Sequence, residues 1–479
     1  MPYTNERSTA SGGFDVLNDP TMQEFLSSVK VSPELSGKRD EIRSRLVDAS
    51  NMSKELGQGI IYASDASMYE AVARENLPSV RVGMLKFSNV IIGVEQYRQL
   101  RDRNEIFVDP IEIAKLKRAS SLMSFPLPGA GITSDDIPKT KCLFREKVFS
   151  GIFQSAKFHV GGISLYDTFI DLLRRSKSVT EEDGTQGILL AKGRKSPVDG
   201  EALADEVFVP LNPGFVDLRP GSRIYVTDAL RIQDVFSEEG SNTECFNRLM
   251  SLLEHLMVAH VVRCSHVTDK TITGHMNVIV DGPLAVFGEA ARFHKSILSL
   301  LHEVRSDCRS KGMRGPLVVG VSKTGKVMEH ANLIREILNF NEDGSPRAGA
   351  VLLPIDDDYR KTYIEPNRIT TTDNFGDETY YGQHFIVRTA RGKVFDVTLA
   401  YPFASKDPVE GQPFRDAKVN LAHYGEDISQ MLSLIDMMQT DLYADALIPV
   451  HLAHRYASIA HSPGGRSLDR FVKEALQVK

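Results

Sequence analysis

Residues 276–284 read MNVIVDGPL, and this stretch decides how the fold is interpreted. Its apolar run 278–280 is typical of a short buried strand, and Asp281 follows it directly, leading into a Gly-Pro turn. A second apolar run, 60–63, lies far earlier in the chain and leads to Asp65. Two apolar strands that are distant in sequence and each end on an aspartate predict an α/β fold with a mixed sheet.

The segments around these strands supply the remaining elements of that fold. Spaced apolar residues predict helices at the positions 34–56, 165–177, 243–263, 289–312, 327–339 and 425–478. Apolar and β-branched residues predict strands at 79–94, at 316–322 and, around a turn, within 380–401. The long strand after Asp65 predicts an antiparallel pair with an acid at the end of its first member.

The chain is long enough for two to four domains, or for one large domain with insertions. We expect a flexible N-terminal tail over 1–35, the first part of a core over 36–125 and its second part, with C-terminal helices, over 241–479. The stretch 126–240 is less regular and contains many prolines and glycines, which predicts an insertion or subdomain on that core.

The composition is that of a soluble globular protein. The 479 residues are 42% hydrophobic and 25% charged, with a formal net charge of -6. No apolar run approaches the roughly 18 residues that cross a bilayer, and the polar N-terminus has no signal-peptide pattern, so we expect no membrane association and a cytoplasmic location. The four cysteines show no spacing typical of zinc sites or disulfide frameworks. A local basic channel for nucleic acid remains compatible with this charge.

Asp65 and Asp281 are the first candidates for chemistry. Either one alone is best explained as a turn former or a helix cap. Carboxylates at adjacent strand ends, however, create an oxygen-rich site for hard divalent cations, and two such ions about 4 Å apart support phosphodiester cleavage. A helix usually supplies a third carboxylate; Glu254 is the first candidate, with a solvated helix position as the alternative, and Glu244 is the second.

Two histidines near the C-terminus are further candidates. His451 and His454 lie three residues apart and share one face if the segment after Pro449 is helical. They can bind a metal, or one of them can contact a scissile phosphate or move a proton. The alternative is a polar helix start after the proline.

The stretch VVGVSKTGK at 318–326 suggests a different class of protein. From Gly320 it spells most of a P-loop, but Val327 occupies the place of the hydroxyl residue that ligates magnesium. The nearest second acidic strand, VLLPIDDDY at 351–359, is interrupted by Pro354. We therefore interpret 316–322 as a strand of the same sheet, with Lys326 as a surface charge at a helix start.

Taken in order, the motifs resemble those of the NurA nucleases, which have an RNase H-like (Piwi-like) core. They are IIYASDAS, LPSVRVGMLKF, MNVIVDGPL, VVGVSKTGK, YYGQHFIVR and LIPVHLAHRYASIA. The family's D-G-[SP]-L motif stands intact at 281–284, while its Asp-Gly-Ser is Asp65-Ala66-Ser67 here. The likeness covers roughly 57–100 and 245–465, which again marks 126–240 as a large insertion.

The last family motif resembles Tyr-Pro-x-Pro-Leu-x-x-Ala-His. Pro449, Ala453 and His454 match it, but the tyrosine position holds Ala446, with Tyr443 nearby as a substitute. The departures at Ala446 and Ala66 keep a second reading open, a catalytically inactive RNase H-like scaffold that only binds DNA or an ATPase.

The resemblance implies an activity, a cofactor and partners. NurA enzymes are homodimeric nucleases that use Mn2+ (or Mg2+), with 5′-to-3′ exonuclease and single-strand endonuclease activity on DNA. They process DNA ends with HerA, a hexameric ATPase translocase, and such pairs serve in repair or antiviral defence. By this resemblance Asp65, Glu254 and Asp281 would hold the metal, and His454 would lie near the scissile phosphate.

If DNA passes through a channel, basic side chains should line it. The candidates are Arg81, Lys86, Lys323, Lys326 and Arg455, and Lys323 stands where the family also tends to carry lysine. For each of them alone, an ordinary solvated surface position is the simpler explanation.

Overall fold

The computed structural model describes residues 19–28, 38–52, 56–74, 77–103, 121–176, 178–218, 222–366, 376, 378–440, 447–459 and 466–477. The chain divides into two units, Met1–Leu46 and Val47–Lys479. The first unit contains helices α2 (Pro20–Ser28) and α3 (Arg39–Ser44), and α2 has no buried side chain. Every element described below belongs to the second unit.

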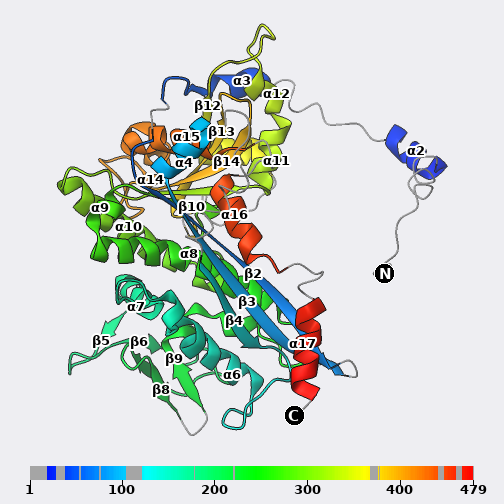
Figure 1. Cartoon of the computed structure of the whole chain (residues 1–479), viewed down its shortest axis with the longest axis vertical. Coiled ribbons are helices and arrows are strands. Elements are labelled where there is room, and N and C mark those ends of the chain that lie inside the picture. Colours follow the sequence, from blue (N-terminus) through cyan, green and yellow to red (C-terminus); the bar gives the residue numbers. More distant parts are fainter. Residues whose placement is uncertain are drawn as a thin grey trace. The chain divides into compact units, whose positions relative to one another are not determined.

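The second unit is built on one large mixed sheet (Figure 1). Nine strands of the described residues form it in the order β1-β12-β13-β14-β11-β10-β2-β3-β4. Their bounds are β1 Val47–Asp48, β2 Ile60–Arg74, β3 Leu77–Gly93, β4 Ser121–Pro128, β10 Met276–Asp281, β11 Leu317–Ser322, β12 Val351–Pro354, β13 Gly382–Arg388 and β14 Val394–Ala400. The predicted α/β fold with a mixed sheet is therefore confirmed.

The strand directions agree with the RNase H-like core that the sequence resemblance implies. β2, β3 and β4 form an antiparallel meander, and β10 and then β11 continue the sheet from β2 with all three strands parallel. Three antiparallel strands followed by two strands parallel to the first are the arrangement expected of that core. β14, β13, β12 and β1 extend the sheet as further antiparallel strands.

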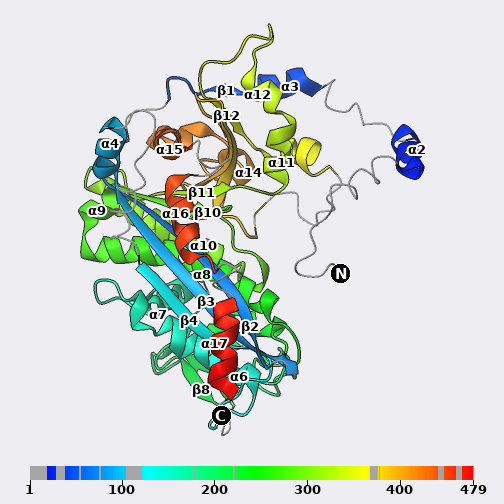
Figure 2. The same cartoon turned by 45° about the vertical axis from the view of Figure 1, so that its right-hand side comes forward.

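Helices cover both faces of the sheet. One face packs on α8 (Thr243–Thr268), α10 (Phe293–Ser310) and the chain between β4 and α8. The other packs on α15 (Glu426–Met438) and α16 (Ile448–Ala457), while α17 (Arg466–Gln477) lies farther along β2 (Figure 2). Remaining helices include α4 (Val94–Arg103), α9 (Lys270–Gly274), α11 (Lys326–Leu333), α12 (Arg335–Asn339), α13 (Asp357–Tyr359) and α14 (Phe414–Ala417). No helix of the described residues has the length and apolar character needed to cross a membrane.

The chain between β4 and α8 forms helices and two small sheets. It contains α6 (Thr140–Glu146), α7 (Leu165–Ser176), and the strands β5 (Val179–Thr180), β6 (Gln186–Leu190), β7 (Val207–Pro210), β8 (Phe215–Asp217) and β9 (Arg223–Tyr225). Its apolar side chains share one core with α8, α10 and the main sheet. Position 126, the expected start of this segment, lies inside β4, which pairs with β3 up to Pro128. We call residues 129–242 the insertion below.

Two predicted element boundaries are wrong for reasons that lie outside the local sequence. The expected helix 34–56 ends at Ser44, because Val47 and Asp48 instead pair with the open edge of β12 as strand β1. The first strand does not end at Asp65 but continues to Arg74, because β3 offers it a partner along its whole length. Only its pairing with β10 stops near Asp65, after Val280 and Ser64.

Candidate metal centre

Strand register places the two aspartates side by side. In the parallel pair of β2 and β10, Val280 lies opposite Ser64, so the next residues, Asp281 and Asp65, are neighbours at the point where β10 ends. Both follow an alternation in which Ala63 and Ile279 face the side of the sheet that packs on α15 and α16. Their carboxylates therefore emerge on one face, beneath α16.

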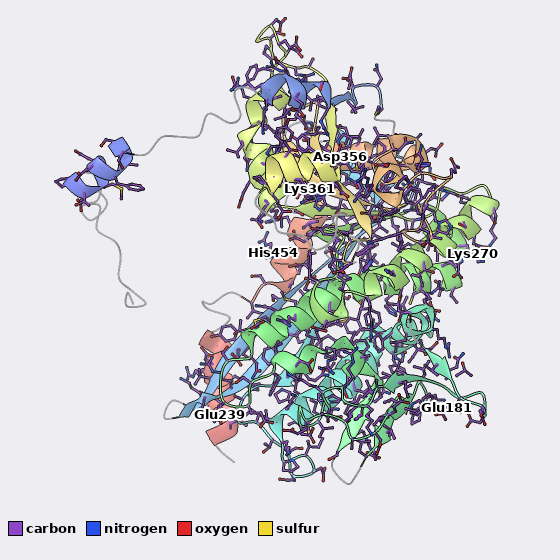
Figure 3. All side chains as sticks on the ribbon, turned by 180° about the vertical axis from the view of Figure 1, so that it is seen from behind. Glu181, Glu239, Lys270, Asp356, Lys361 and His454 are labelled. Carbon is purple, nitrogen blue, oxygen red and sulfur yellow. The ribbon has the colours of Figure 1, made fainter. Side chains whose placement is uncertain are left out.

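α16 brings a histidine to the same point. The helix begins at Ile448, with Pro449 in its first turn, as the sequence predicts. His454 lies on this helix (Figure 3), and its Nδ1 is 2.9 Å from Asp65 Oδ2. One ligand atom from each of Asp65, Asp281 and His454 lies within 4.8 Å of the others. In the described part of the chain, no other three or more histidine, cysteine or acidic side chains come together in this way.

Glu254 reaches the centre from the opposite face of the sheet. Because β10 ends beside Ser64, the backbone N–H of Ala66 has no strand partner on that side, and it donates to Glu254 Oε1 at 3.1 Å. The other predicted candidate, Glu244, is an exposed residue that pairs with Arg248 at 2.7 Å. The structure thus brings Glu254 to the aspartates and leaves Glu244 near the start of α8.

Two acids of this centre, Glu254 and Asp65, have raised pKa values. Burial raises the pKa of Glu254 well above its usual value, and the charges of Asp65 and Asp281 raise it further, while the Ala66 N–H acts in the opposite direction. Burial also raises the pKa of Asp65, where the nearby His454 opposes the effect and Asp281 adds to it. A divalent cation would relieve this repulsion, because it supplies positive charge where carboxylates crowd.

The donor set fits a hard or borderline divalent metal. Asp65, Asp281 and Glu254 offer carboxylate oxygens, and His454 offers an imidazole nitrogen; carboxylates suit Mg2+ and Mn2+, and an imidazole is tolerated by the latter. No cysteine contributes, because all four cysteines are buried elsewhere as free thiols. The residues present therefore fit the metal that the sequence resemblance implies.

Lys323 lies in the same centre. It comes two residues after Val321, which pairs with Asp281, and its Nζ is 2.7 Å from Asp281 Oδ2. Its charge, together with those of His454 and Arg455, also lowers the pKa of His451, for which burial is the first cause. His454 lies on the side of α16 that faces this centre, and Lys323 provides the positive charge nearest to Asp281.

The other predicted basic residues divide into two groups. Lys86 lies opposite Ser67 on the α16 side of β3, where its Nζ is 3.4 Å from the backbone oxygen of Ser458, and Arg455 is exposed on α16. Arg81 is far along β3, opposite Val72, and pairs with Glu70 at 3.4 Å. The structure thus does not bring Arg81 to the centre, because β2 and β3 run well past it.

The P-loop alternative receives no support from the geometry. Lys326 is the first residue of α11 and forms an ion pair with Glu365 at 2.8 Å. Gly320 is required by packing, since a Cβ there would lie 2.4 Å from the Gly282 carbonyl oxygen and from Thr398 Oγ1. This glycine therefore supports the turn that follows Asp281, and no phosphate is needed to explain it.

The acidic residues after Pro354 cap a helix and form an ion pair away from Gly320. Pro354 does not interrupt β12, as the sequence suggested, but is its last residue, opposite Phe385. Asp356 caps α13 through the Tyr359 N–H, and Asp357 pairs with buried Lys418 at 2.7 Å. Two strands, β13 and β14, separate β12 from β11, which carries Gly320, so these acids do not complete a nucleotide site beside Gly320.

Two departures from the family motifs have different outcomes. Ala66 lies in regular extended backbone and its side chain is buried in the core on the α8 side, so the strand accommodates it in place of glycine. Ala446 and its suggested substitute Tyr443 lie outside the described residues.

Comparisons with known proteins were made for sequence and structure. The chain matches no protein-family model and no curated protein sequence. Among solved structures it is similar to the NurA nuclease from Sulfolobus solfataricus, with 8% identity, 98% of each chain covered and a TM-score of 0.37. A structure of NurA bound to dAMP and manganese follows, with 11% identity, 97% of each chain covered and a TM-score of 0.32. These structural neighbours are NurA structures, but TM-scores of this size carry no weight for function, which is inferred below from the site residues.

Proposed function

We propose that this chain is a divalent-metal-dependent nuclease that hydrolyses phosphodiester bonds in DNA. The observation that carries the proposal is the convergence of Asp65, Asp281 and His454 within 4.8 Å, with Glu254 reaching the same point through the Ala66 N–H. These residues come from four elements that are distant in the sequence. Crowded carboxylates with raised pKa values at a strand end are a costly arrangement, which a bound cation would stabilise.

The residues take distinct roles in this proposal. Asp65 and Asp281 would hold Mn2+ or Mg2+ on the α16 side, and Glu254 would complete the set from the α8 side. The bound metal would supply an activated water and charge stabilisation at the leaving oxygen. His454 fixes the Asp65 carboxylate through its Nδ1 contact and is exposed enough to meet a phosphate or to move a proton.

Basic residues around the centre would hold the strand. Lys323 lies against Asp281, Lys86 lies next to the end of α16 and Arg455 is exposed on that helix. A phosphate that approached the metal would therefore meet three positive side chains on one face of the sheet. Arg81 is left out of this role because it is remote and pairs with Glu70.

The finer features of the proposal follow the sequence resemblance. They are 5′-to-3′ exonuclease and single-strand endonuclease activity, a homodimer, and joint work with a HerA-type hexameric ATPase on DNA ends in repair or antiviral defence. Residues 36–125 and 241–479 would form the nuclease core, and the insertion would be an addition to it. Manganese and dAMP are the ligands of a solved NurA structure, and the same ligand chemistry is proposed for this chain.

A cleavage assay tests the proposal directly. End-labelled single-stranded DNA should be degraded with Mn2+ and preserved with EDTA, and Asp281→Asn should abolish degradation. Asp217→Asn is the matched control, because Asp217 is also a strand residue whose carboxylate accepts from a cation, Arg223 at 2.8 Å, but lies in the insertion. Near wild-type cleavage by Asp281→Asn would refute the metal site, and inactive wild-type protein would favour the inactive scaffold.

A further inference from the structure

Two adjoining cavities form a groove between α8, the segment that follows β10 and the insertion. The first, of about 690 Å3, is lined by α8 and by the segment that follows Asp281; the second, of about 910 Å3, is lined by the insertion and Arg292. Arg231 and Glu289 line both cavities, so the two cavities adjoin at these side chains. We call the two together the insertion groove.

The insertion groove carries an excess of positive charge. Its cationic side chains are Arg194, Lys195, Arg231, Arg248 and Arg292. Two of its acids pair with the groove's own arginines: Asp234 with Arg231 at 2.6 Å, and Glu244 with Arg248 at 2.7 Å. This leaves Glu289 against Arg194, Lys195 and Arg292, none of which has an acidic partner among the residues that the structure describes.

Three arginines of the groove, Arg194, Arg231 and Arg292, lie close enough together to favour binding of an anion. Burial lowers the pKa of Arg292, and the charges of Arg194 and Arg231 lower it further, which shows that the three guanidinium groups repel one another. The Arg292 Nε is buried without a hydrogen-bond partner, while its Nη2 donates to the Ala229 carbonyl at 2.9 Å. Phosphate oxygens would neutralise the positive charge that these three guanidinium groups bring together.

Exposed apolar side chains lie between these charges. Phe287 is 57% exposed, and its ring meets that of Tyr380 edge-on, with centroids 5.9 Å apart. The backbone next to it is fixed, because the Val286 N–H donates to the Thr379 carbonyl at 3.0 Å. Leu189 is also largely exposed where it lines the second cavity. Aromatic surfaces combined with positive charge are the features that bind single-stranded nucleic acid without reading its sequence.

The insertion groove lies on the α8 side of the sheet, the side from which Glu254 reaches the metal centre. Phe287 lies only six residues after Asp281, which limits their separation to about 20 Å even in fully extended chain. On α8, His255 lines the groove and directly follows Glu254. A 2.8 Å contact between His255 Nδ1 and the Tyr381 hydroxyl fixes the His255 side chain at this end of the groove.

We propose that the insertion groove binds the phosphodiester backbone of a single DNA strand and leads it past Phe287 to the metal centre. The proposal rests on the proposed nuclease function and gives the insertion a role within it. The cations Arg194, Lys195 and Arg292 contact phosphates, and Phe287 stacks on a base.

Binding measured without cleavage tests this path. Fluorescence anisotropy of a labelled oligothymidine of about 20 nucleotides, in EDTA, should show Lys195→Glu and Phe287→Ala each weakening affinity about tenfold, and Lys195→Glu lowering the salt slope by about one. Lys192→Glu is the matched control, since Lys192 lies in the same loop, is 71% exposed and does not line the groove. It should bind as wild type does.

A second experiment varies the length of the competing DNA strand. Thymidine monophosphate and an oligothymidine of about four nucleotides should compete poorly against the longer strand, and their affinity should not respond to Lys195→Glu. Equal loss of binding in Lys195→Glu and Lys192→Glu would refute the proposal that the insertion groove binds a DNA strand. A monophosphate that competes as well as the long strand would refute it too. If the binding pattern holds but wild-type protein cuts no DNA with Mn2+, the groove stands and the nuclease function fails.

Discussion

Removing the Asp281 carboxylate should remove most of the stabilisation by Mn2+ and leave the metal-free fold nearly unchanged. Asparagine keeps the shape of the side chain and an acceptor for Lys323 Nζ, which lies 2.7 Å away. The Lys323–Asp281 pair is partly exposed, at 33% and 22%, so its loss should cost at most about 1 kcal/mol of unfolding free energy. Relief of the repulsion that Asp281 exerts on Asp65 acts in the opposite direction.

The expected size of the metal effect follows from mass action and chain length. Mn2+ at a hundred times its dissociation constant stabilises the folded state by about 2.7 kcal/mol. Unfolding the unit Val47–Lys479, roughly 430 residues, carries an entropy near 0.9 kcal/mol/K, so the melting temperature should rise by about 3 °C. A hundredfold weaker site in Asp281→Asn would reduce this rise to about 0.5 °C at the same Mn2+ concentration.

Calorimetry or circular dichroism should follow the transition, because the chain contains no tryptophan. Asp217→Asn is again the control, since it loses a carboxylate next to Arg223 by the same substitution. The control should keep the full rise with Mn2+. An undiminished rise in Asp281→Asn, or its loss in Asp217→Asn, would show that the ion binds elsewhere.

Three further results are expected. Mn2+ affinity should fall as pH falls, because the pKa values of Asp65 and Glu254 are raised and both carboxyls must ionise to bind the ion. Calorimetry in two buffers should also show that binding releases protons. A Mn2+ affinity that does not change with pH would contradict this. Gly320→Ala should lower both the melting temperature and cleavage by distorting the turn below it, while Gly151→Ala, with free space at its Cβ, should not. Lys323→Met should bind Mn2+ more tightly and short oligonucleotides more weakly in the same titrations, since the ammonium both competes with the ion and attracts phosphate; unchanged values for both would remove Lys323 from the site.

The parts of the fold that the sequence predicts well are those with local causes. The apolar period that predicts 243–263 corresponds to α8, and the run before Asp281 is β10. The aspartates could be predicted as neighbours because apolar strands that end on acids meet at one edge of a sheet. The sequence favours Glu254 over Glu244 as the third acid, and in the structure Glu254 approaches the aspartates while Glu244 does not.

The parts that the sequence predicts poorly depend on partners far along the chain. β2 runs past Asp65 because β3 pairs with it. Arg81 lies on the part of β3 that pairs with β2 beyond Asp65, where it forms an ion pair with Glu70 and does not reach the metal centre. The sequence does not predict the insertion groove, because Arg194 lies in an irregular segment and Arg292 lies in the helix predicted over 289–312. Only the tertiary fold brings the two arginines together.

The point where β10 ends explains why the candidate centre forms there. Up to Ser64 the strand β2 has partners on both sides, and beyond it one side is open. That opening gives Glu254 the Ala66 N–H, places Asp65 beside Asp281 and leaves room for His454 above them. A register shift of one residue between β2 and β10 would turn Asp65 toward α8 and bury it in the apolar core, so the centre depends on register more than on any single loop. Gly320 protects that register from the neighbouring strand, because only a residue without Cβ lets the turn after Asp281 lie directly against β11.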